Sequence, residues 1–256
     1  MIPKTIHYCW LSDEPQPELI RACIESWKKV LPDYEIKKWS MTSFDVHSVR
    51  FVKEACEQKK WAFAADYIRL YALYHEGGIY LDTDVFVKKS FDSFLENDCF
   101  SSIEYTEHLF KESVAKNLVD TKGHATNDNL ILIPGIAIQA AVLGSVAGNP
   151  YIRDCLAYYK DKPFILDNGE LNNKNILPNV MAFIAKDYGF QYLNKEQLLK
   201  SGVRLYPSYY FAGYPDLEQH NSYAVHCCCG SWRQKSPLRK LIDYMKQLRF
   251  MSKNKK

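Results

Sequence analysis

The stretch from Trp61 to Val85 constrains the fold of this chain more than any other part of its sequence. Residues 61–76 repeat apolar side chains at helical spacing, and Gly77-Gly78 then predicts a helix end followed by a tight turn. Residues 79–81 are apolar enough for a short buried strand. A helix that runs directly into a buried strand is typical of α/β sheets, where ligands bind at the strand ends.

Two acids, Asp82 and Asp84, follow that strand and are separated by Thr83. Because alternate residues of a strand share a face, we expect both carboxylates to point the same way. Carboxylates this close repel each other unless a cation lies beside them, and a divalent ion held by them keeps positions for phosphate oxygens. A lone D-x-D arises often by chance, but its place at a strand end favours a metal site that binds a nucleotide diphosphate.

The first forty residues predict the start of a parallel sheet. Residues 4–10 and 34–39 have strand character, and Pro17 to Val30 between them has the apolar stripe of an amphipathic helix. The chain contains neither G-x-G-x-x-G nor G-K-[ST], which argues against a dinucleotide fold and a P-loop. With 256 residues and no division into equal halves, we expect one α/β domain.

The helix at 61–76 carries two charges before its last turn, Asp66 and Arg69, on one face. Small and apolar residues such as Ala62 and Leu73 lie a turn away, which predicts that the pair is at least partly buried. An exposed ion pair contributes little to stability, whereas a buried pair is costly unless it is compensated. We therefore favour a functional pair, with an ordinary ion pair as the alternative.

Composition is that of a soluble globular protein, with 47% apolar and 25% charged residues, and nothing predicts nucleic-acid binding. The eight cysteines lack a disulfide framework, so we expect reduced thiols in the cytoplasm. A zinc site that joins His226 to Cys227–Cys229 is a weaker alternative, because no C-x-x-C spacing supports it. The charge-free run 130–148 includes Pro134 and three glycines, and predicts a buried strand and a helix rather than a membrane span.

The segment AFAADYIRLYALYHEGGIYLDTDV, residues 62–85, resembles the signature of glycosyltransferases with a DXD sugar-binding region. That family includes yeast initiating mannosyltransferases and bacterial capsular-polysaccharide transferases, which share A-x-x-D-x-x-R, a Gly-Gly-x-Tyr turn and D-x-D. The resemblance implies a GT-A fold, which is a Rossmann-like mixed α/β sheet flanked by helices. It also implies a UDP- or GDP-sugar donor, a Mn²⁺ or Mg²⁺ ion, and retention of the anomeric configuration.

The same resemblance implies roles for individual residues. Asp84 would bind the ion directly, and Asp82 would bind it through water or reach the ribose or sugar of the donor. Asp66 and Arg69 would bind hydroxyls of the donor sugar, and Tyr80 would line the pocket.

The opening IPKTIHYCWLS resembles the first strand of the family, where an aromatic side chain stacks on the nucleobase. That role falls on Trp10, with His7 and Tyr8 nearby as further donor-binding residues.

Near the other end, HCCCGSW resembles the family pattern H-x-x-x-G-S-W. By this match His226 would be a further metal ligand, and Ser231 and Trp232 would hold the departing diphosphate. The three consecutive cysteines depart from the family pattern, so the fine contacts of this loop are the least defined.

The middle of the chain, 96–200, contains no motif that assigns an acceptor residue. Helices are expected from Pro150 to Tyr159 and from Pro178 to Tyr188. The aromatic segment 204–215 resembles a family segment on the acceptor side, although a packed loop is the simpler interpretation.

Residues 236–256 contain seven Lys or Arg and one Asp, whereas the whole chain has a net charge of +3. We expect 1–235 to form the catalytic domain and 236–256 a basic amphipathic helix or tail. Such a helix binds anionic membranes, which would place a cytoplasmic protein peripherally on the inner face of the cell membrane. A helix packed on the protein body is an equal alternative.

The sequence therefore predicts a metal-dependent retaining hexosyltransferase that moves a sugar from a nucleotide-sugar donor to a saccharide or lipid-linked oligosaccharide acceptor, in capsular or surface polysaccharide assembly. No side chain is identified as a general base. An inactive nucleotide-sugar-binding module is the alternative. An aspartate-dependent phosphohydrolase is disfavoured, because Phe86 stands where D-x-D-x-[TV] needs Thr or Val.

Overall fold

The computed structural model describes residues 1–213, 218–227, 236, 242, 245–246, 249–250 and 252–253. Within these ranges eight strands form the main sheet, in the order β2-β1-β3-β7-β5-β9-β8 with β6 beside β5. The strands are β1 (Thr5–Cys9), β2 (Glu35–Trp39), β3 (Gly78–Leu81), β5 (Cys99–Tyr105), β6 (Ile136–Ile138), β7 (Val142–Ser145), β8 (Gln197–Leu198) and β9 (Val203–Tyr206).

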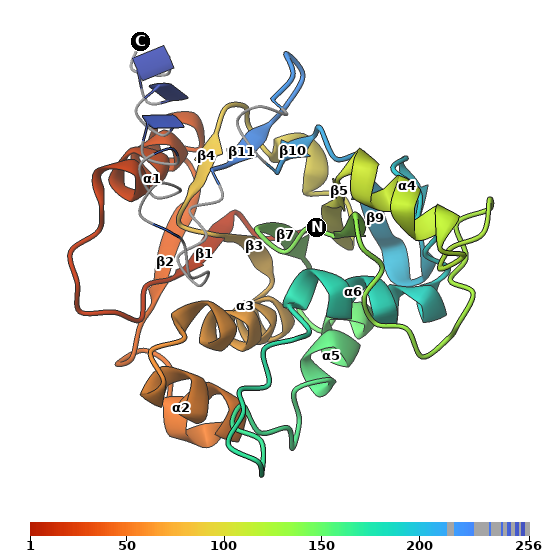
Figure 1. Cartoon of the computed structure of the whole chain (residues 1–256). Coiled ribbons are helices and arrows are strands. Elements are labelled where there is room, and N and C mark those ends of the chain that lie inside the picture. The colour runs from red at the N-terminus through yellow and green to blue at the C-terminus, as the bar shows by residue number, and fades with distance from the viewer. Residues whose placement is uncertain are drawn as a thin grey trace.

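The sheet is mixed. β1 is parallel to β2 and β3, and β5 is parallel to β9, whereas β7 lies antiparallel between β3 and β5. Helices cover both faces (Figure 1): α1 (Glu18–Val30), α2 (Arg50–Glu57), α3 (Trp61–Glu76), α4 (Glu107–Ala115), α5 (Pro150–Ala157) and α6 (Leu177–Ala185), with short 3₁₀ turns at Val46–Ser48, Asp92–Phe94, Lys186–Tyr188 and Lys200–Gly202. A mixed α/β sheet flanked by helices, with the expected opening βαβ order, is therefore confirmed for the described residues.

β3 is buried on both of its faces, which explains why its sequence shows no polar alternation. Ile79 and Leu81 pack in the core under α1, whereas Tyr80 points to the opposite face and packs with residues of α3. Together α2, α3, α5 and α6 cover that second face (Figure 1). The acids that follow β3 thus emerge from the most enclosed part of the sheet.

Gly77 and Gly78 make the tight connection from α3 to β3. Both have positive φ, at 69° and 104°. A Cβ on Gly78 would lie 2.7 Å from the carbonyl oxygen of Thr5 and 3.0 Å from Nε2 of His7. Only glycine therefore fits between the helix and β1 at this point.

The run 130–148 differs from its prediction of a strand followed by a helix. It forms two short strands, β6 and β7, both antiparallel to β5, and the next helix begins at Pro150. Short apolar runs do not distinguish a strand from a buried helix, and here the pairing partners decide.

A second sheet joins β10 (Phe211–Ala212), β11 (Ala224–His226) and β4 (Val85–Val87). Helix α1 holds β4 in place, because the indole N–H of Trp27 donates to the Val85 carbonyl at 2.7 Å and the Val87 N–H donates to the Ser26 hydroxyl at 2.9 Å. This sheet brings the end of β11, the last described strand, beside the turn that precedes β4.

Two of the described residues after 236 contact the body of the protein, one of them at this second sheet. Phe250 is buried and packs edge-on against Phe86, with 5.4 Å between the ring centres. Nζ of Lys253 lies 3.3 Å from Oε2 of Glu218. Ile242 and Met245 are instead exposed. These contacts favour packing on the body for part of the tail, and its binding to an anionic membrane stays a prediction.

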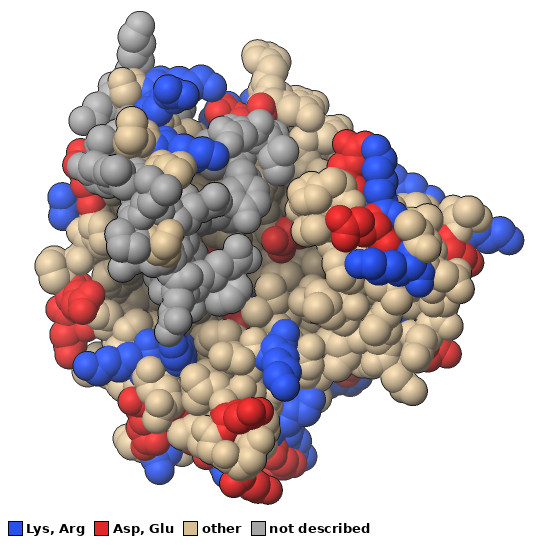
Figure 2. Space-filling view, in the orientation of Figure 1, with Lys and Arg blue, Asp and Glu red and all other residues tan. Residues whose placement is uncertain are grey.

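The surface over α4 carries both signs of charge (Figure 2), with ion pairs from Lys111 to Glu107 and from Lys116 to Glu112 one turn apart. None of the helices in the described part of the chain is both long and apolar enough to cross a membrane.

Candidate active site

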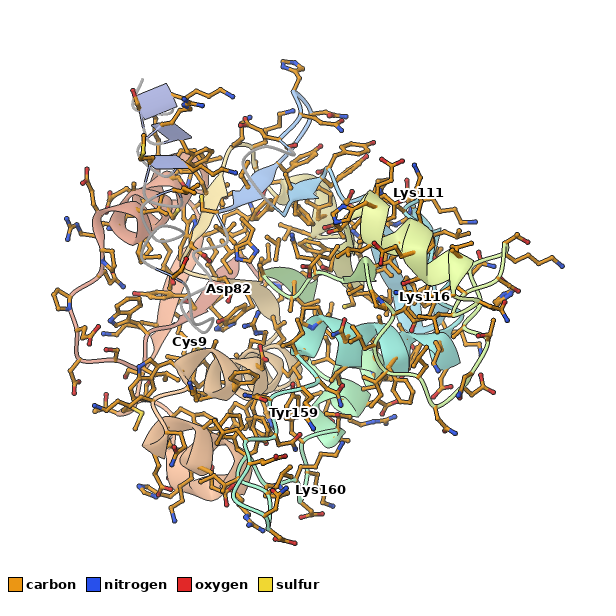
Figure 3. The ribbon with its side chains drawn as sticks, viewed as in Figure 1. Cys9, Asp82, Lys111, Lys116, Tyr159 and Lys160 are labelled. Atoms are coloured by element: carbon orange, nitrogen blue, oxygen red, sulfur yellow. The ribbon has the colours of Figure 1, made fainter. Side chains whose placement is uncertain are left out.

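The two acids lie in a turn between β3 and β4, near the centre of the molecule (Figure 3). The Asp82 N–H donates to the Ala141 carbonyl at 2.9 Å, and the Val85 N–H donates back to the Asp82 carbonyl at 3.0 Å. The expectation that strand alternation aligns the carboxylates is therefore wrong. A β-turn, fixed at both ends by strands, aligns them instead.

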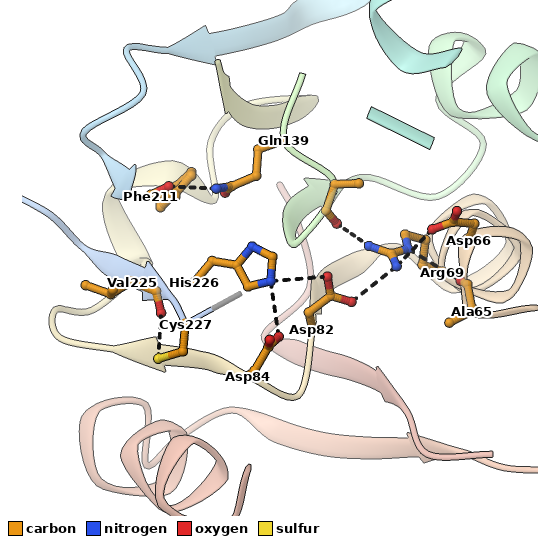
Figure 4. Close-up of polar contacts among 11 residues, drawn as sticks. Ala65, Asp66, Arg69, Asp82, Asp84, Gln139, Phe211, Val225, His226 and Cys227 are labelled. Atoms are coloured by element: carbon orange, nitrogen blue, oxygen red, sulfur yellow. Dashed lines mark hydrogen bonds and ion pairs between the residues drawn. The ribbon is translucent and has the colours of Figure 1, made fainter. Parts of the chain in front are cut away.

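His226 meets both acids from the second sheet. It is the last residue of β11, opposite Val85 in the antiparallel pair, and the N–H of Cys227 donates to the Asp84 carbonyl at 2.8 Å. Its Nε2 lies 3.2 Å from Oδ1 of Asp84 and 4.0 Å from Oδ2 of Asp82 (Figure 4). The structure thus brings together three residues that the sequence separates widely.

These three side chains form a set of ligands suited to a divalent cation. One ligand atom from each lies within 4.8 Å of the other two, and the side chains of Asp82 and His226 are 27% and 21% exposed. Two carboxylate oxygens and one imidazole nitrogen suit Mn²⁺, and also Mg²⁺ less closely, and partial exposure leaves room for further ligands. The donor set therefore fits the cation that the sequence implies.

The alternative zinc site with the cysteine triplet gains no support from Cys227. Its buried thiol hydrogen-bonds with Cys23 of α1, and this bond and burial raise its pKa far above the usual range. Among the described residues, the side chains close enough to hold a metal join His226 to Asp82 and Asp84, not to Cys227. Cys228 and Cys229 lie outside the described residues, as do the predicted diphosphate-binding residues Ser231 and Trp232.

Asp66 and Arg69 form the predicted pair, and its burial is confirmed: the side chains are 13% and 5% exposed, with NH2 of Arg69 3.1 Å from Oδ1 of Asp66. The same nitrogen lies 3.2 Å from Oδ1 of Asp82 (Figure 4). Burial raises the pKa of Asp66 to about 7, while the charge of Arg69 opposes the rise. Burial alone would lower the pKa of Arg69, but the carboxylates of Asp82 and Asp66 raise it, so this guanidinium remains charged.

Tyr80 lies beneath that guanidinium. The side chain is buried, and the Arg69 carbon Cζ lies 4.5 Å from the centre of its ring. Tyr80 therefore supports the site from inside the core, and its predicted place in the wall of the donor pocket stays a prediction.

His7 and Tyr8 lie on opposite faces of β1, and Trp10 follows directly after the strand. His7 is fully buried, its Nε2 2.8 Å from the Gly77 carbonyl and its Nδ1 3.2 Å from the indole nitrogen of Trp39. Tyr8 packs edge-on against Trp27, and the indole of Trp10 donates to the Glu14 carbonyl. His7 thus has a structural role in this fold, whereas base stacking by Trp10 stays a prediction.

Sequence reasoning missed the backbone groups that complete the site. The Ala140 carbonyl accepts from NH1 of Arg69 at 2.6 Å, and the Ala141 carbonyl accepts from Asp82. The N–H of Leu177, at the start of α6, donates to the Asp66 carboxylate and lowers its pKa. Backbone groups have no residue type to mark them in a sequence, so only the fold shows their positions.

Residues 17–101 match the family described as a glycosyltransferase sugar-binding region containing a DXD motif. The matched range includes both acids of the turn and the Asp66–Arg69 pair, but not His226. A comparison with curated proteins gave no match.

Solved glycosyltransferase structures have a similar arrangement. Mouse xyloside xylosyltransferase 1, in its apo form, superimposes with a TM-score of 0.50 at 12% identity, over 89% of this chain and 98% of that chain. The PaToxG glycosyltransferase gives 0.49 at 18% identity, over 73% and 69% of the two chains. The galactosyltransferase LgtC, in complex with donor and acceptor sugar analogs, gives 0.45 at 13% identity, over 88% and 87%. The likeness to the xylosyltransferase shows that the mixed sheet flanked by helices is the GT-A fold that the sequence predicts.

Proposed function

We propose that this chain, a glycosyltransferase with a DXD-type sugar-binding region, transfers a sugar from a nucleotide diphosphate donor to a saccharide acceptor and needs a divalent cation for it. The convergence of Asp82, Asp84 and His226 carries this proposal. Two ligands from the turn that joins the sheets and one from a strand of the second sheet, in a partly exposed site at the end of a central strand, suit a cation that must also bind a substrate.

Different residues of the site would bind the cation and the donor sugar. Asp84 and His226 would hold the cation, with Asp82 as a third ligand directly or through water. A cation bound there would offset the negative charge that develops on the diphosphate as the anomeric C–O bond breaks. Arg69 contacts both Asp66 and Asp82, and the Asp66–Arg69 pair would bind hydroxyls of the donor sugar.

Asp84→Asn should lower the rate of transfer by about a thousandfold, because an amide removes the charge that binds the cation but keeps the shape of the turn. Radiolabelled sugar transfer from UDP- and GDP-sugars, with Mn²⁺ and with Mg²⁺, measures this. Asp161→Asn is the matched control, because Asp161 is exposed in a peripheral loop beside Lys160 (Figure 3). Full activity of Asp84→Asn would refute the metal assignment.

A thermal shift series with UDP, GDP, CDP and dTDP, each with and without Mn²⁺, identifies the donor class, because a ligand of the folded state raises the melting temperature. A metal-dependent shift without turnover of any sugar would favour the inactive binding module instead. Retention of configuration and a lipid-linked acceptor in surface polysaccharide assembly complete the proposal. The anomeric proton of the first product, observed by NMR, tests the stereochemistry.

A further inference from the structure

The pairing of β4 with β11 brings two of the cation ligands, Asp84 and His226, together. Asp84 directly precedes β4, and His226 lies opposite Val85 in the antiparallel pair, where the N–H of Cys227 donates to the Asp84 carbonyl at 2.8 Å. Each strand has only three residues. A strand pair this short is not stable by itself, so its position depends on the side chains that pack against its two faces.

The two faces of this strand pair are covered by different parts of the chain. Val85, Val87 and Ala224 are fully buried in a core that includes residues of α1. Phe86 and Val225 are partners across the strands and lie on the other face. That outer face belongs to a smaller cluster, to which α1 and the C-terminal segment both contribute: Leu19, Cys23, Phe86, Ala212, Val225, Cys227 and Phe250.

Phe250, near the C-terminus, packs on this outer face. Its side chain is 5% exposed, and its ring is perpendicular to the ring of Phe86, with 5.4 Å between the ring centres. An edge-to-face pair of this kind stabilises a contact beyond the burial of its apolar area. Phe250 therefore restrains β4 only two residues away from Asp84.

A cluster of charged side chains restrains the other end of β4. Lys88 follows the strand directly and pairs with Glu218, whose side chain is 9% exposed in the connection between β10 and β11. Nζ of Lys253 lies 3.3 Å from Oε2 of the same glutamate. Burial alone would raise the pKa of Glu218, but the two lysines lower it, so this carboxylate remains charged. The C-terminal segment thus restrains β4 at two points, directly through Phe250 and indirectly through Glu218.

We infer that Phe250 and Lys253 are positioning residues for the cation site, because they fix β4 against β11 and so hold Asp84 beside His226. The inference rests on the proposed function, since it concerns the same cation. It also extends the catalytic domain, which the sequence predicts to end at 235, to include part of the C-terminal segment.

The Mn²⁺ affinity of the full chain, measured from the free Mn²⁺ signal in electron paramagnetic resonance, tests this inference. Phe250→Ala should weaken Mn²⁺ binding by about tenfold, as loss of groups that orient metal ligands does. Phe250→Leu keeps a large apolar side chain and should recover most of the affinity. Met245→Ala is the matched control, because Met245 is 62% exposed in the same segment, and its Mn²⁺ affinity should equal that of the wild type.

A double variant shows whether Phe250 acts through Phe86. If it does, Phe86→Ala combined with Phe250→Ala should bind Mn²⁺ no more weakly than the weaker of the two single variants, because both changes break one contact. Losses of affinity that multiply would place the effect of Phe250 elsewhere and overturn the inference.

Melting temperatures without metal separate positioning from a general loss of stability. Phe250→Ala should lower the melting temperature by no more than roughly 5 °C, since the outer cluster is small. A lower melting temperature with unchanged Mn²⁺ affinity is the result for a purely stabilising contact, and it would contradict the inference.

Lys253→Met provides a second test should the Phe250 variants not fold, and charge alone predicts the opposite result. Removal of a positive charge would by itself strengthen the binding of a cation, whereas loss of a positioning contact should weaken it by about twofold or more. Lys116→Met is its control, because it removes the same charge from an ion pair on α4.

Equal or tighter Mn²⁺ binding by Phe250→Ala, or by a folded Lys253→Met protein, would overturn the inference and leave the proposed function intact. A wild-type protein that binds no Mn²⁺ would instead refute the proposed function itself, and the inference with it.

Discussion

The two histidines His7 and His226 lie in opposite kinds of environment, although the sequence places both in the candidate site. His7 is fully buried in the main sheet, and both of its ring nitrogens bond partners from the core. His226 ends a strand of the second sheet, is 21% exposed, and directs Nε2 toward two carboxylates. The difference shows that the main sheet supplies rigidity here, whereas its junction with the second sheet supplies the side chains that could hold a cation.

The bonds of His7 also define its protonation. Trp39 donates to Nδ1, so the ring proton lies on Nε2 and is donated to the Gly77 carbonyl. A second proton on Nδ1 would face another donor. Burial lowers the pKa of His7, and the bond to Gly77 opposes this only in part. His7 is therefore a neutral side chain that links β1 to the residue before β3 through its hydrogen bond to Gly77.

The largest effect is expected from His7→Phe. The substitution leaves the buried Gly77 carbonyl and the Trp39 indole without partners, which should cost about 3 kcal/mol of the free energy of unfolding. Urea denaturation measures the loss. Mn²⁺ affinity of the folded variant should stay at the wild-type value, and a large fall in that affinity would show that the two histidines are not separate in function.

His226→Gln should give the reverse pattern. Loss of the imidazole should weaken Mn²⁺ binding by roughly ten- to a hundredfold, because one of three ligands is removed, and should change the free energy of unfolding by less than about 1 kcal/mol. Mn²⁺ titration and urea denaturation of one preparation measure both quantities. His108→Gln, at an exposed position of α4, is the matched control. If His226→Gln lost as much stability as His7→Phe, the two histidines would not differ in their structural roles.

The smallest effect is a dependence of stability on pH that comes from His7. Because its pKa is lowered on folding, the unfolded chain binds a proton below about pH 6.5 that the folded chain does not bind. His7 thus contributes its full stability above pH 6.5, and that stability falls as the pH drops toward the folded pKa, by at most about 1.4 kcal/mol per pH unit. Melting curves between pH 7.5 and 5 should show the fall in the wild type and a smaller one in His7→Phe. Identical slopes for the two proteins would assign the effect to other groups.

Local sequence patterns predicted the elements whose partners are close in the chain. The helix at Trp61–Glu76 ends at its predicted residues, because Gly77 supplies the positive φ that a helix end needs. The pair of Asp66 and Arg69 is buried as the surrounding small residues predict. Both predictions depend on neighbours within one helix.

Predictions failed or were lacking where distant segments decide the structure. The turn that aligns Asp82 with Asp84 depends on Ala141, and the two strands within 130–148 depend on pairing with β5. Resemblance, not spacing, suggested His226, because a lone histidine in an apolar strand has no local signal of its role. The backbone carbonyls that accept hydrogen bonds from Arg69 have no sequence pattern that would identify them either.

The antiparallel pairing of β4 with β11 also has a consequence for how the protein is made. A ribosome releases both carboxylates with the first third of the chain, but the imidazole only after nearly all the remaining described sheet has been synthesised. A nascent chain can therefore form most of the main sheet before it can hold a cation with all three ligands. Cation capture would then report synthesis as far as β11, since it needs that strand to reach the turn made near the beginning.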